Sequence, residues 1–176
     1  VFFNLRIPRT IAAFIAGFGL GCCGLVFQIL FTNPLASPDM IGVSSSASAG
    51  AAFAILFLGN TSTTITICAF IGSLLAVLLT LGLSSLSSFK NTSGLILSGV
   101  AIHSISQTIV MLLKLIADPE KELASIEYWM MGGLNAITID QLPMLIVIVG
   151  ICIILLIILY KQVLLLSMNE DEASLL

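Results

Sequence analysis

The chain has 176 residues, of which 59% are hydrophobic and only 9% are charged, and its mean hydropathy is +1.19. Soluble domains contain about 45–50% apolar and about 25% charged residues, so this composition excludes a water-soluble fold. The net charge of −3 is small and forms no basic stripe, which argues against a nucleic-acid partner.

Charged residues are absent from four long stretches, residues 10–38, 40–89, 91–113 and 141–160. A helix needs about 20 mostly apolar residues to cross a bilayer. The 40–89 stretch is too long for one crossing and is interrupted by Gly59-Asn-Thr-Ser62, a loop composition, so we divide it in two. The sequence therefore predicts an all-α, polytopic transmembrane helical bundle with five crossings, at residues 9–31, 43–58, 63–83, 94–117 and 142–160.

Small residues mark the first two predicted crossings. In the 9–31 helix, Ala13, Gly17 and Gly21 recur every four residues, a face that allows another helix to approach closely. The 43–58 helix begins with a run of Ser, Ala and Gly. Such side chains suit tight packing against a neighbouring backbone, with the wall of a wet cavity as the alternative.

The predicted 94–117 helix has the most polar interior of the five. Lipid cannot satisfy polar groups, so they face a bundle interior or a water-filled path. We predict that this helix lines a passage, with Ser98, His103, Ser106 and Gln107 as candidate path residues. His103 has no Cys, Asp or Glu near it in sequence, so a hydrogen-bonded neutral histidine is favoured over a metal ligand and no metal site is predicted.

The most charged segment lies between the last two predicted crossings. Residues 120–131 can form a short helix, and Tyr128 and Trp129 suit the membrane interface, so we predict an interfacial helix. The 142–160 crossing is rich in Ile, Leu and Val, which predicts contact with lipid.

The sequence contains no Walker motif, no G-x-S-x-G and no H-E-x-x-H. Its four cysteines, Cys22, Cys23, Cys68 and Cys152, lie in apolar stretches without C-x-x-C spacing, which suggests neither zinc nor a disulfide framework. The prediction is a transport or channel component without enzymatic activity or a cofactor of its own, so any nucleotide hydrolysis would be done by another chain.

The segments that connect the predicted helices carry the most specific patterns. In chain order they read Leu5-Arg-Ile-Pro-Arg9, Gln28-x4-Asn33-Pro-Leu-Ala-x-Pro38-x3-Gly42-Val-Ser44, Leu97-Ser-Gly-Val-Ala101, Tyr128-Trp-Met-Met-Gly-Gly133 and Leu166-Ser-Met-Asn-Glu-Asp-Glu-Ala173. They resemble, in the same order, sequence motifs of the FecCD-type permeases, which are the membrane subunits of ABC importers for iron-siderophore, haem and cobalamin compounds. The matches extend over nearly the whole chain.

The resemblance implies a ten-helix subunit in the bacterial plasma membrane, of which this chain corresponds to the second through sixth helices. It also implies four kinds of partner: membrane lipid, a second permease subunit that is identical or paralogous, cytoplasmic ATPase subunits, and an extracytoplasmic substrate-binding protein.

The same resemblance assigns expected roles to individual residues. Arg6 and Arg9 match a pair that salt-bridges the binding protein. The residues that match the family motif at a cytoplasmic turn are Gln28, Asn33, Pro34, Pro38 and Gly42. The residues expected to begin the ATPase coupling segment at 167–176 are Glu170, Asp171 and Glu172.

Three residues differ from the family pattern, and the distribution of basic residues differs from the positive-inside rule. Asp39, Ser46 and Asn169 stand where the family commonly has Gly. In the family orientation four basic residues are extracytoplasmic and two are cytoplasmic, the reverse of the positive-inside expectation. We keep that orientation because Arg6 and Arg9 then have a docking role and because the rule applies to a complete protein.

Two alternatives remain open from the sequence, a stand-alone small channel or membrane scaffold, and a non-functional half-permease. The permease hypothesis predicts a coding sequence that continues beyond Leu176, whereas both alternatives predict one that ends there. No segment presents a distinctive ligand set that would name the cargo.

Overall fold

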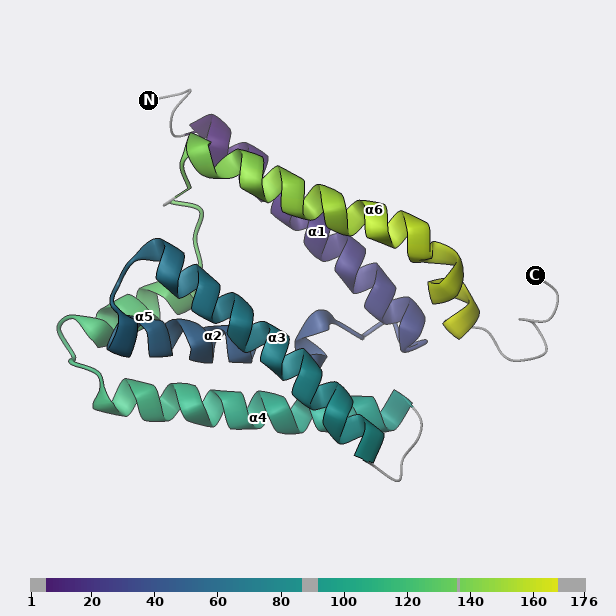
Figure 1. The fold of residues 1–176 in the computed structure, drawn as a ribbon, viewed down its shortest axis with the longest axis horizontal. Coiled ribbons are helices and arrows are strands. Elements are labelled where there is room, and N and C mark those ends of the chain that lie inside the picture. The colour runs from purple at the N-terminus through teal and green to yellow at the C-terminus, as the bar shows by residue number, and fades with distance from the viewer. Residues whose placement is uncertain (1–5, 87–91, 136, 168–176) are drawn as a thin grey trace. The chain divides into compact units, whose positions relative to one another are not determined.

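The computed structural model describes residues 6–86, 92–135 and 137–167. The chain divides into two compact units, one made of Val1–Ser37 with Gly133–Leu176 and the other of Pro38–Gly132. We call them the terminal unit and the central unit. Helices dominate both (Figure 1), which confirms the predicted all-α class.

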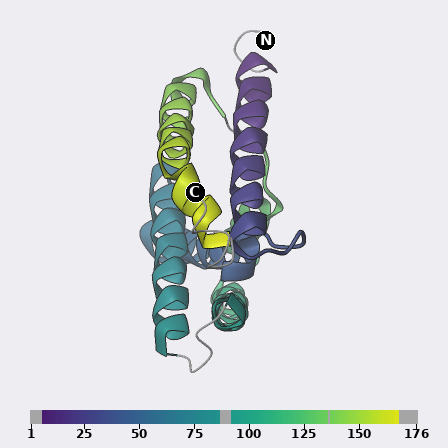
Figure 2. The same cartoon turned by 90° about the vertical axis from the view of Figure 1, so that its right-hand side faces the viewer.

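The terminal unit is built on two long apolar helices, α1 (Ile7–Leu30) and α6 (Leu142–Ser167). They lie side by side and run in the same direction (Figures 1 and 2). Near the start of α1, Arg9 Nη2 donates to the carbonyl oxygen of Asn135 at 2.9 Å, shortly before α6 begins. Further along, a Cβ atom on Gly19 would lie 3.7 Å from Val149 Cγ1. The pairing of α1 with α6 is therefore parallel.

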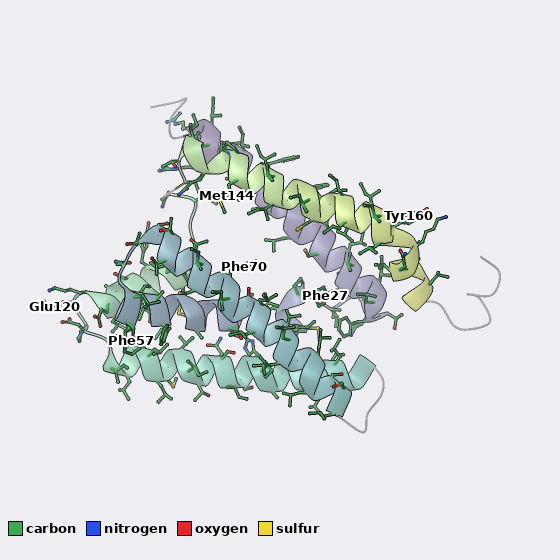
Figure 3. All side chains as sticks on the ribbon, in the orientation of Figure 1. Phe27, Phe57, Phe70, Glu120, Met144 and Tyr160 are labelled. Atoms are coloured by element: carbon green, nitrogen blue, oxygen red, sulfur yellow. The ribbon has the colours of Figure 1, made fainter. Side chains whose placement is uncertain are left out.

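Large apolar side chains of α6 remain exposed along its length. They include Met144 near its start and Tyr160 towards its end (Figure 3). In water such a surface would be highly unfavourable, whereas lipid solvates it at no cost. This distribution agrees with the lipid contact predicted for the last crossing.

The described residues of the central unit, 38–86 and 92–132, form four α-helices and one π-helical segment. In chain order they are α2 (Val43–Phe53), the π-helical segment Ala54–Leu58, α3 (Ser62–Leu86), α4 (Thr92–Ile116) and α5 (Glu122–Met131). The predicted short helix at 120–131 is thus present as α5. The core side chains are small or β-branched for the most part: Ala51, Ala52, Ala54, Ile55, Ile65, Ala69, Leu113, Ala117 and Ile126.

Close backbone approach fixes α2 against α3 and α4. A Cβ atom on Gly50 of α2 would collide with the carbonyl group of Cys68 on α3, and one on Gly72 of α3 would lie 2.5 Å from the carbonyl oxygen of Ser46. On α4, a Cβ atom on Gly99 would collide with the carbonyl group of Met40, just before α2. We call these contacts the glycine seam.

Gly42 precedes α2 and requires glycine for two independent reasons. Its φ angle is +80°, in the left-handed region that residues with a Cβ rarely adopt, and an added Cβ would lie 2.9 Å from the backbone nitrogen of His103. Gly42 therefore sets both the entry of the chain into α2 and its contact with α4.

Four described helices are long and apolar enough to cross a membrane: α1, α3, α4 from Gly94, and α6 up to Leu165. They correspond to four of the five predicted crossings. The fifth, Val43–Leu58, consists of only 11 α-helical and five π-helical residues. At about 1.5 Å per residue it spans about 24 Å, less than the roughly 30 Å of hydrocarbon in a typical bilayer.

The direction of α6 decides whether this short segment crosses. Because α1 and α6 are parallel, both start on the same side of the membrane. The chain leaves α1 on the opposite side, so the number of crossings between the two helices must be odd. If α3 and α4 each cross, a third crossing is needed between α1 and α6, and the segment predicted to supply it is Val43–Leu58. Local bilayer thinning can accommodate its shortness. This fifth crossing stays a prediction.

Residue accessibility tests this topology in the full-length protein with its native cysteines replaced. Five crossings place Asn60→Cys and Glu120→Cys on one side and Leu35→Cys on the other, whereas four place all three together. All three native side chains are exposed. We expect a membrane-impermeant maleimide to label Asn60→Cys and Glu120→Cys from the same side of intact cells or inverted vesicles, and Leu35→Cys only from the other.

The glycine seam gives a matched pair of substitutions on one helix. Gly72→Ala forces a backbone clash with α2, whereas a Cβ atom on Gly82 of α3 meets nothing within 4 Å. We expect Gly72→Ala to destabilise the full-length protein by about 1–3 kcal/mol. Gly82→Ala should be neutral or stabilising by up to about 1 kcal/mol. Thermal unfolding in detergent measures both, and equal stabilities would contradict the seam.

Candidate translocation face and connecting segments

The helix predicted to line a passage, α4, has two distinct faces within the central unit. One face packs on α2 and α3 and includes Gly99, Ile102, Ser106 and Val110, all of which are buried. We call it the seam face. The opposite face carries Ser104, Gln107, Thr108 and Met111, all exposed, and we call it the outward face. The polar residues of α4 are thus divided between two environments.

The four candidate path residues do not share one face. Ser98 and Ser106 are buried at 8% and 6% exposure, His103 is half-buried, and Gln107 is exposed on the outward face. Their role in a path stays a prediction, but Gln107 has the geometry that contact with a passing molecule requires.

Ser106 makes the polar contact at the centre of the glycine seam. Its Oγ lies 2.5 Å from Oγ of Ser46 on α2, and both side chains are buried. Each of these buried hydroxyls has the other as its hydrogen-bond partner, as a buried polar group requires.

His103 lies at the edge of the seam. Its backbone nitrogen contacts Gly42, and its side chain makes no hydrogen bond with another described residue. Among the described residues, no group of three or more His, Cys, Asp or Glu side chains could hold a metal ion.

The outward face combines hydroxyls, one amide and apolar atoms. Ser104 Oγ donates to the carbonyl oxygen of Val100 at 2.9 Å, and Thr108 Oγ1 donates to that of Ser104 at 2.9 Å. A depression of about 240 Å³ on this side of α4 is lined by Gln107, Thr108, Val110, Met111 and Lys114. Of this outward set, Gln107 alone is among the candidate path residues predicted from the sequence, and polarity did not separate it from Ser98 and Ser106 in the seam.

The end of α4 is tied to α5 by an ion pair. Lys114 Nζ lies 2.8 Å from Glu127 Oε1, and both side chains are partly solvent-exposed. Beneath this pair Ile126 is buried at 1% exposure and anchors α5 on the core. Surface ion pairs contribute about 0–1 kcal/mol, so burial of Ile126 rather than the ion pair holds α5 in place.

A groove of about 520 Å³ lies between α5 and the α2–α3 connection. Its polar lining includes Asn60, Ser62, Lys121 and Ser125, and Trp129 forms part of its apolar side. Asn60 Nδ2 donates to Ser125 Oγ at 3.2 Å, which links the connection to α5. Glu120, another lining residue, projects at the α4–α5 connection (Figure 3).

The two arginines predicted to dock a binding protein differ in environment. Arg6 is exposed, whereas Arg9 is half-buried and donates to the carbonyl oxygen of Asn135. Arg9 Nε is buried and has no hydrogen-bond partner among the described residues. The Arg6 side chain makes no hydrogen bond or ion pair within the described part of the chain and is accessible to an external partner, while Arg9 also joins α1 to the segment before α6.

The motif at the end of α1 forms a locally hydrogen-bonded loop. Gln28 Nε2 donates to the carbonyl oxygen of Pro34 at 3.0 Å, and the backbone N–H of Leu35 donates to Asn33 Oδ1 at 2.9 Å. These contacts give Gln28 and Asn33 a structural role, because the amide side chains replace hydrogen bonds that the backbone loses at the turn. Pro38 begins a short 3₁₀ turn that ends at Ile41. The predicted coupling residues Glu170, Asp171 and Glu172 lie outside the described residues.

These features define a polytopic, all-helical membrane protein with one polar-faced helix. The chain belongs to the FecCD transport family, whose model matches residues 1–176. The predicted family resemblance is thereby confirmed.

Relatives with assigned roles are permease components of ABC transporters. A protein assigned as an ABC transporter permease in Methanocaldococcus jannaschii is 38% identical over 77% of this chain and 42% of its own length. The permease of a molybdate import system from Haemophilus influenzae is 35% identical over 99% of this chain and 51% of its own. The vitamin B12 import permease of Salmonella paratyphi A is 33% identical over 85% of this chain and 46% of its own length.

A solved structure agrees with these relatives. A transporter assigned to the metal-chelate ABC type, in an inward-facing conformation, matches with a TM-score of 0.87 at 31% identity, over 99% of this chain and 55% of that one. The chain thus spans about half the length of the relatives it matches.

A double-mutant cycle tests the polar contact in the seam. Ser46→Ala or Ser106→Ala alone leaves the remaining buried hydroxyl without its partner, whereas the double variant removes both. We expect a coupling free energy of about 0.5–1.5 kcal/mol in the unfolding of the full-length permease. Pairing Ser46→Ala with Ser104→Ala, whose hydroxyl lies on the outward face, should give coupling near zero. Similar coupling in both cycles would refute a specific contact.

Proposed function

We propose that this chain forms part of the membrane-spanning permease of an ABC importer and that the outward face of α4 walls the translocation path. The observation that carries the proposal is the division of α4 into a tightly packed seam face and an exposed face on which polar side chains lie among apolar ones such as Met111. Polar side chains in a membrane protein face protein or water rather than lipid. Ser104, Gln107 and Thr108 therefore suit a water-filled path.

The proposed assembly has the composition known for this kind of importer. A second permease subunit, identical or paralogous, would supply the facing wall, and cytoplasmic ATPase subunits would bind and hydrolyse ATP. An extracytoplasmic protein would deliver the cargo, for which we propose an iron-siderophore, haem or cobalamin-type chelate. The vitamin B12 permease and the metal-chelate transporter among the similar proteins support this class.

The proposed orientation places the starts of α1 and α6 on the extracytoplasmic side of the plasma membrane. Arg6 and Arg9 then face the binding protein, α5 lies at the same surface, and the loop held by Gln28 and Asn33 faces the cytoplasm. Coupling to the ATPases through Glu170, Asp171 and Glu172 belongs to the same proposal. Charged rim contacts of this kind steer docking and fix register.

Single substitutions separate the docking role from the structural one. Because Arg6 is exposed and free, Arg6→Glu should weaken functional docking of the binding protein, with the half-maximal concentration for uptake rising about tenfold. Arg6→Lys should retain most activity. Arg9→Glu should impair docking and also lower the unfolding temperature, because it removes the contact with Asn135. In the Arg6→Glu/Arg9→Glu variant, uptake should be abolished.

Uptake into proteoliposomes containing the full-length permease and its ATPases measures the docking effect, and purification of the intact complex controls for assembly. Undiminished uptake by Arg6→Glu/Arg9→Glu would contradict the docking role. Absence of ATP-dependent uptake of any substrate by the wild-type complex with its binding protein would contradict the proposed function as a whole.

A further inference from the structure

The segment predicted as the second crossing has two parts that differ in backbone geometry. The first part, α2, is α-helical and is fixed to α3 at the glycine seam, where Gly50 leaves no room for a Cβ atom. The second part, Ala54–Leu58, is π-helical, so its hydrogen bonds span five residues instead of four. A π-helical turn holds one residue more than the α-helical path requires. This extra residue lies directly after the seam.

The π-helical segment is buried where three other helices meet. Ala54 and Ile55 are 0% and 5% exposed, and both belong to one apolar cluster with Ile65 of α3, Leu113 of α4 and Ile126 of α5. α5 contacts both α2 and the π-helical segment, and all of these contacts are made inside the central unit. The position of α5 therefore depends on which side chains the π-helical segment turns towards it.

The π-helical segment and α5 each end on a glycine in the same rare backbone conformation. Gly59 follows the π-helical segment with φ +100° and ψ 162°, and Gly132 follows α5 with φ +71° and ψ 160°. This region is accessible essentially to glycine alone, and residues in sparsely populated backbone regions cluster at switch regions of proteins. Glycine also changes φ and ψ at little steric cost. The chain can therefore change direction at both points while the helices beside them stay intact.

We propose that Ala54–Leu58 is a register switch of the transport cycle, which changes between π-helix and α-helix while the glycine seam stays closed. In the change each backbone N–H exchanges an acceptor five residues earlier for one four residues earlier, so no buried backbone group loses its partner. The residues after the extra one turn by about 100° and shift by about 1.5 Å along the helix axis. The surface under Ile126 changes with them, and α5 moves as a unit. This inference rests on the proposed function, because it assigns the switch to a cycle driven by ATP.

Hydrogen–deuterium exchange of the wild-type, full-length transporter with its ATPase subunits tests the switch. The complex is compared without nucleotide and with a non-hydrolysable ATP analogue. Amides of residues 54–60 should differ at least about threefold in exchange rate between the two states, because their hydrogen bonds change partners. Amides of residues 43–53 should exchange equally, because the seam stays closed. Equal exchange at 54–60, or a change that extends equally through 43–53, would overturn the proposal.

A deletion tests whether transport needs the extra residue. Deleting Phe57, which lies within the segment (Figure 3), leaves too few residues for the π-helical turn and fixes the α-helical register. ATP-dependent uptake into proteoliposomes should fall at least about tenfold, and the exchange difference at 54–60 should disappear. Phe57→Leu keeps the residue count and is the matched control, with uptake within about twofold of wild type.

Uptake by the deletion variant at the wild-type rate would contradict the switch. If the deletion prevents assembly of the complex, the exchange comparison in the wild-type protein decides alone. Either contradiction leaves the proposed function standing when the wild-type complex imports, whereas a wild-type complex without ATP-dependent uptake refutes the function itself.

Discussion

The central unit depends on the backbone contact that α2 makes with α3 and α4. A membrane-embedded helix gains little by moving apolar side chains from lipid into protein, so its association relies on close packing and hydrogen bonds. α2 is suited to this because its own side chains are small and because Gly50 and Gly72 lack the Cβ atoms that would separate its backbone from that of α3. Gly99 in the same way lets α4 approach the turn that precedes α2. Gly42 then sets the angle at which the chain enters the helix. The same contacts let a segment too short to span an average bilayer remain fixed at membrane depth.

This packing determines what α4 can present on its other side. Because the seam face packs against α2 and α3, the polar side chains of α4 that do not lie on that face are exposed on the other side of the helix. Ser106 contacts Ser46 in the seam, whereas Gln107, the next residue, is rotated away by about 100°. One helix can therefore be both a structural element and the proposed wall of a path. The hydrogen bond between Ser46 and Ser106 links the two helices in the seam.

The helical class could be predicted from the sequence because a segment that lies in lipid must lack charged residues, whatever its neighbours in the fold are. The long charge-free stretches therefore marked the membrane helices directly. The sequence could not determine whether Val43–Leu58 crosses, since that depends on the parallel pairing of α1 with α6, helices far apart in the chain. Nor did polarity alone distinguish Ser106 from Gln107. A usable signal was present in the seven-residue spacing of Gly99 and Ser106, which puts two small residues on one face and marks the contact side of the helix. Arg9 was predicted only as a docking residue because its contact with Asn135 spans 126 positions of sequence.

The outward face also has the energetic character that passage requires. Conduction needs contacts favourable enough to admit the cargo and weak enough to release it. A fixed charge in a low-dielectric path would interact strongly with a charged cargo, and several free donors would trap an anion. Ser104 and Thr108 avoid this because their protons are bound to the helix, and Lys114 avoids it because Glu127 neutralises its charge at the end of α4. Gln107 is exposed on the same face, and one hydrogen bond to its amide would contribute roughly 0.5–1.5 kcal/mol, an interaction that a transport cycle can form and break in every turnover.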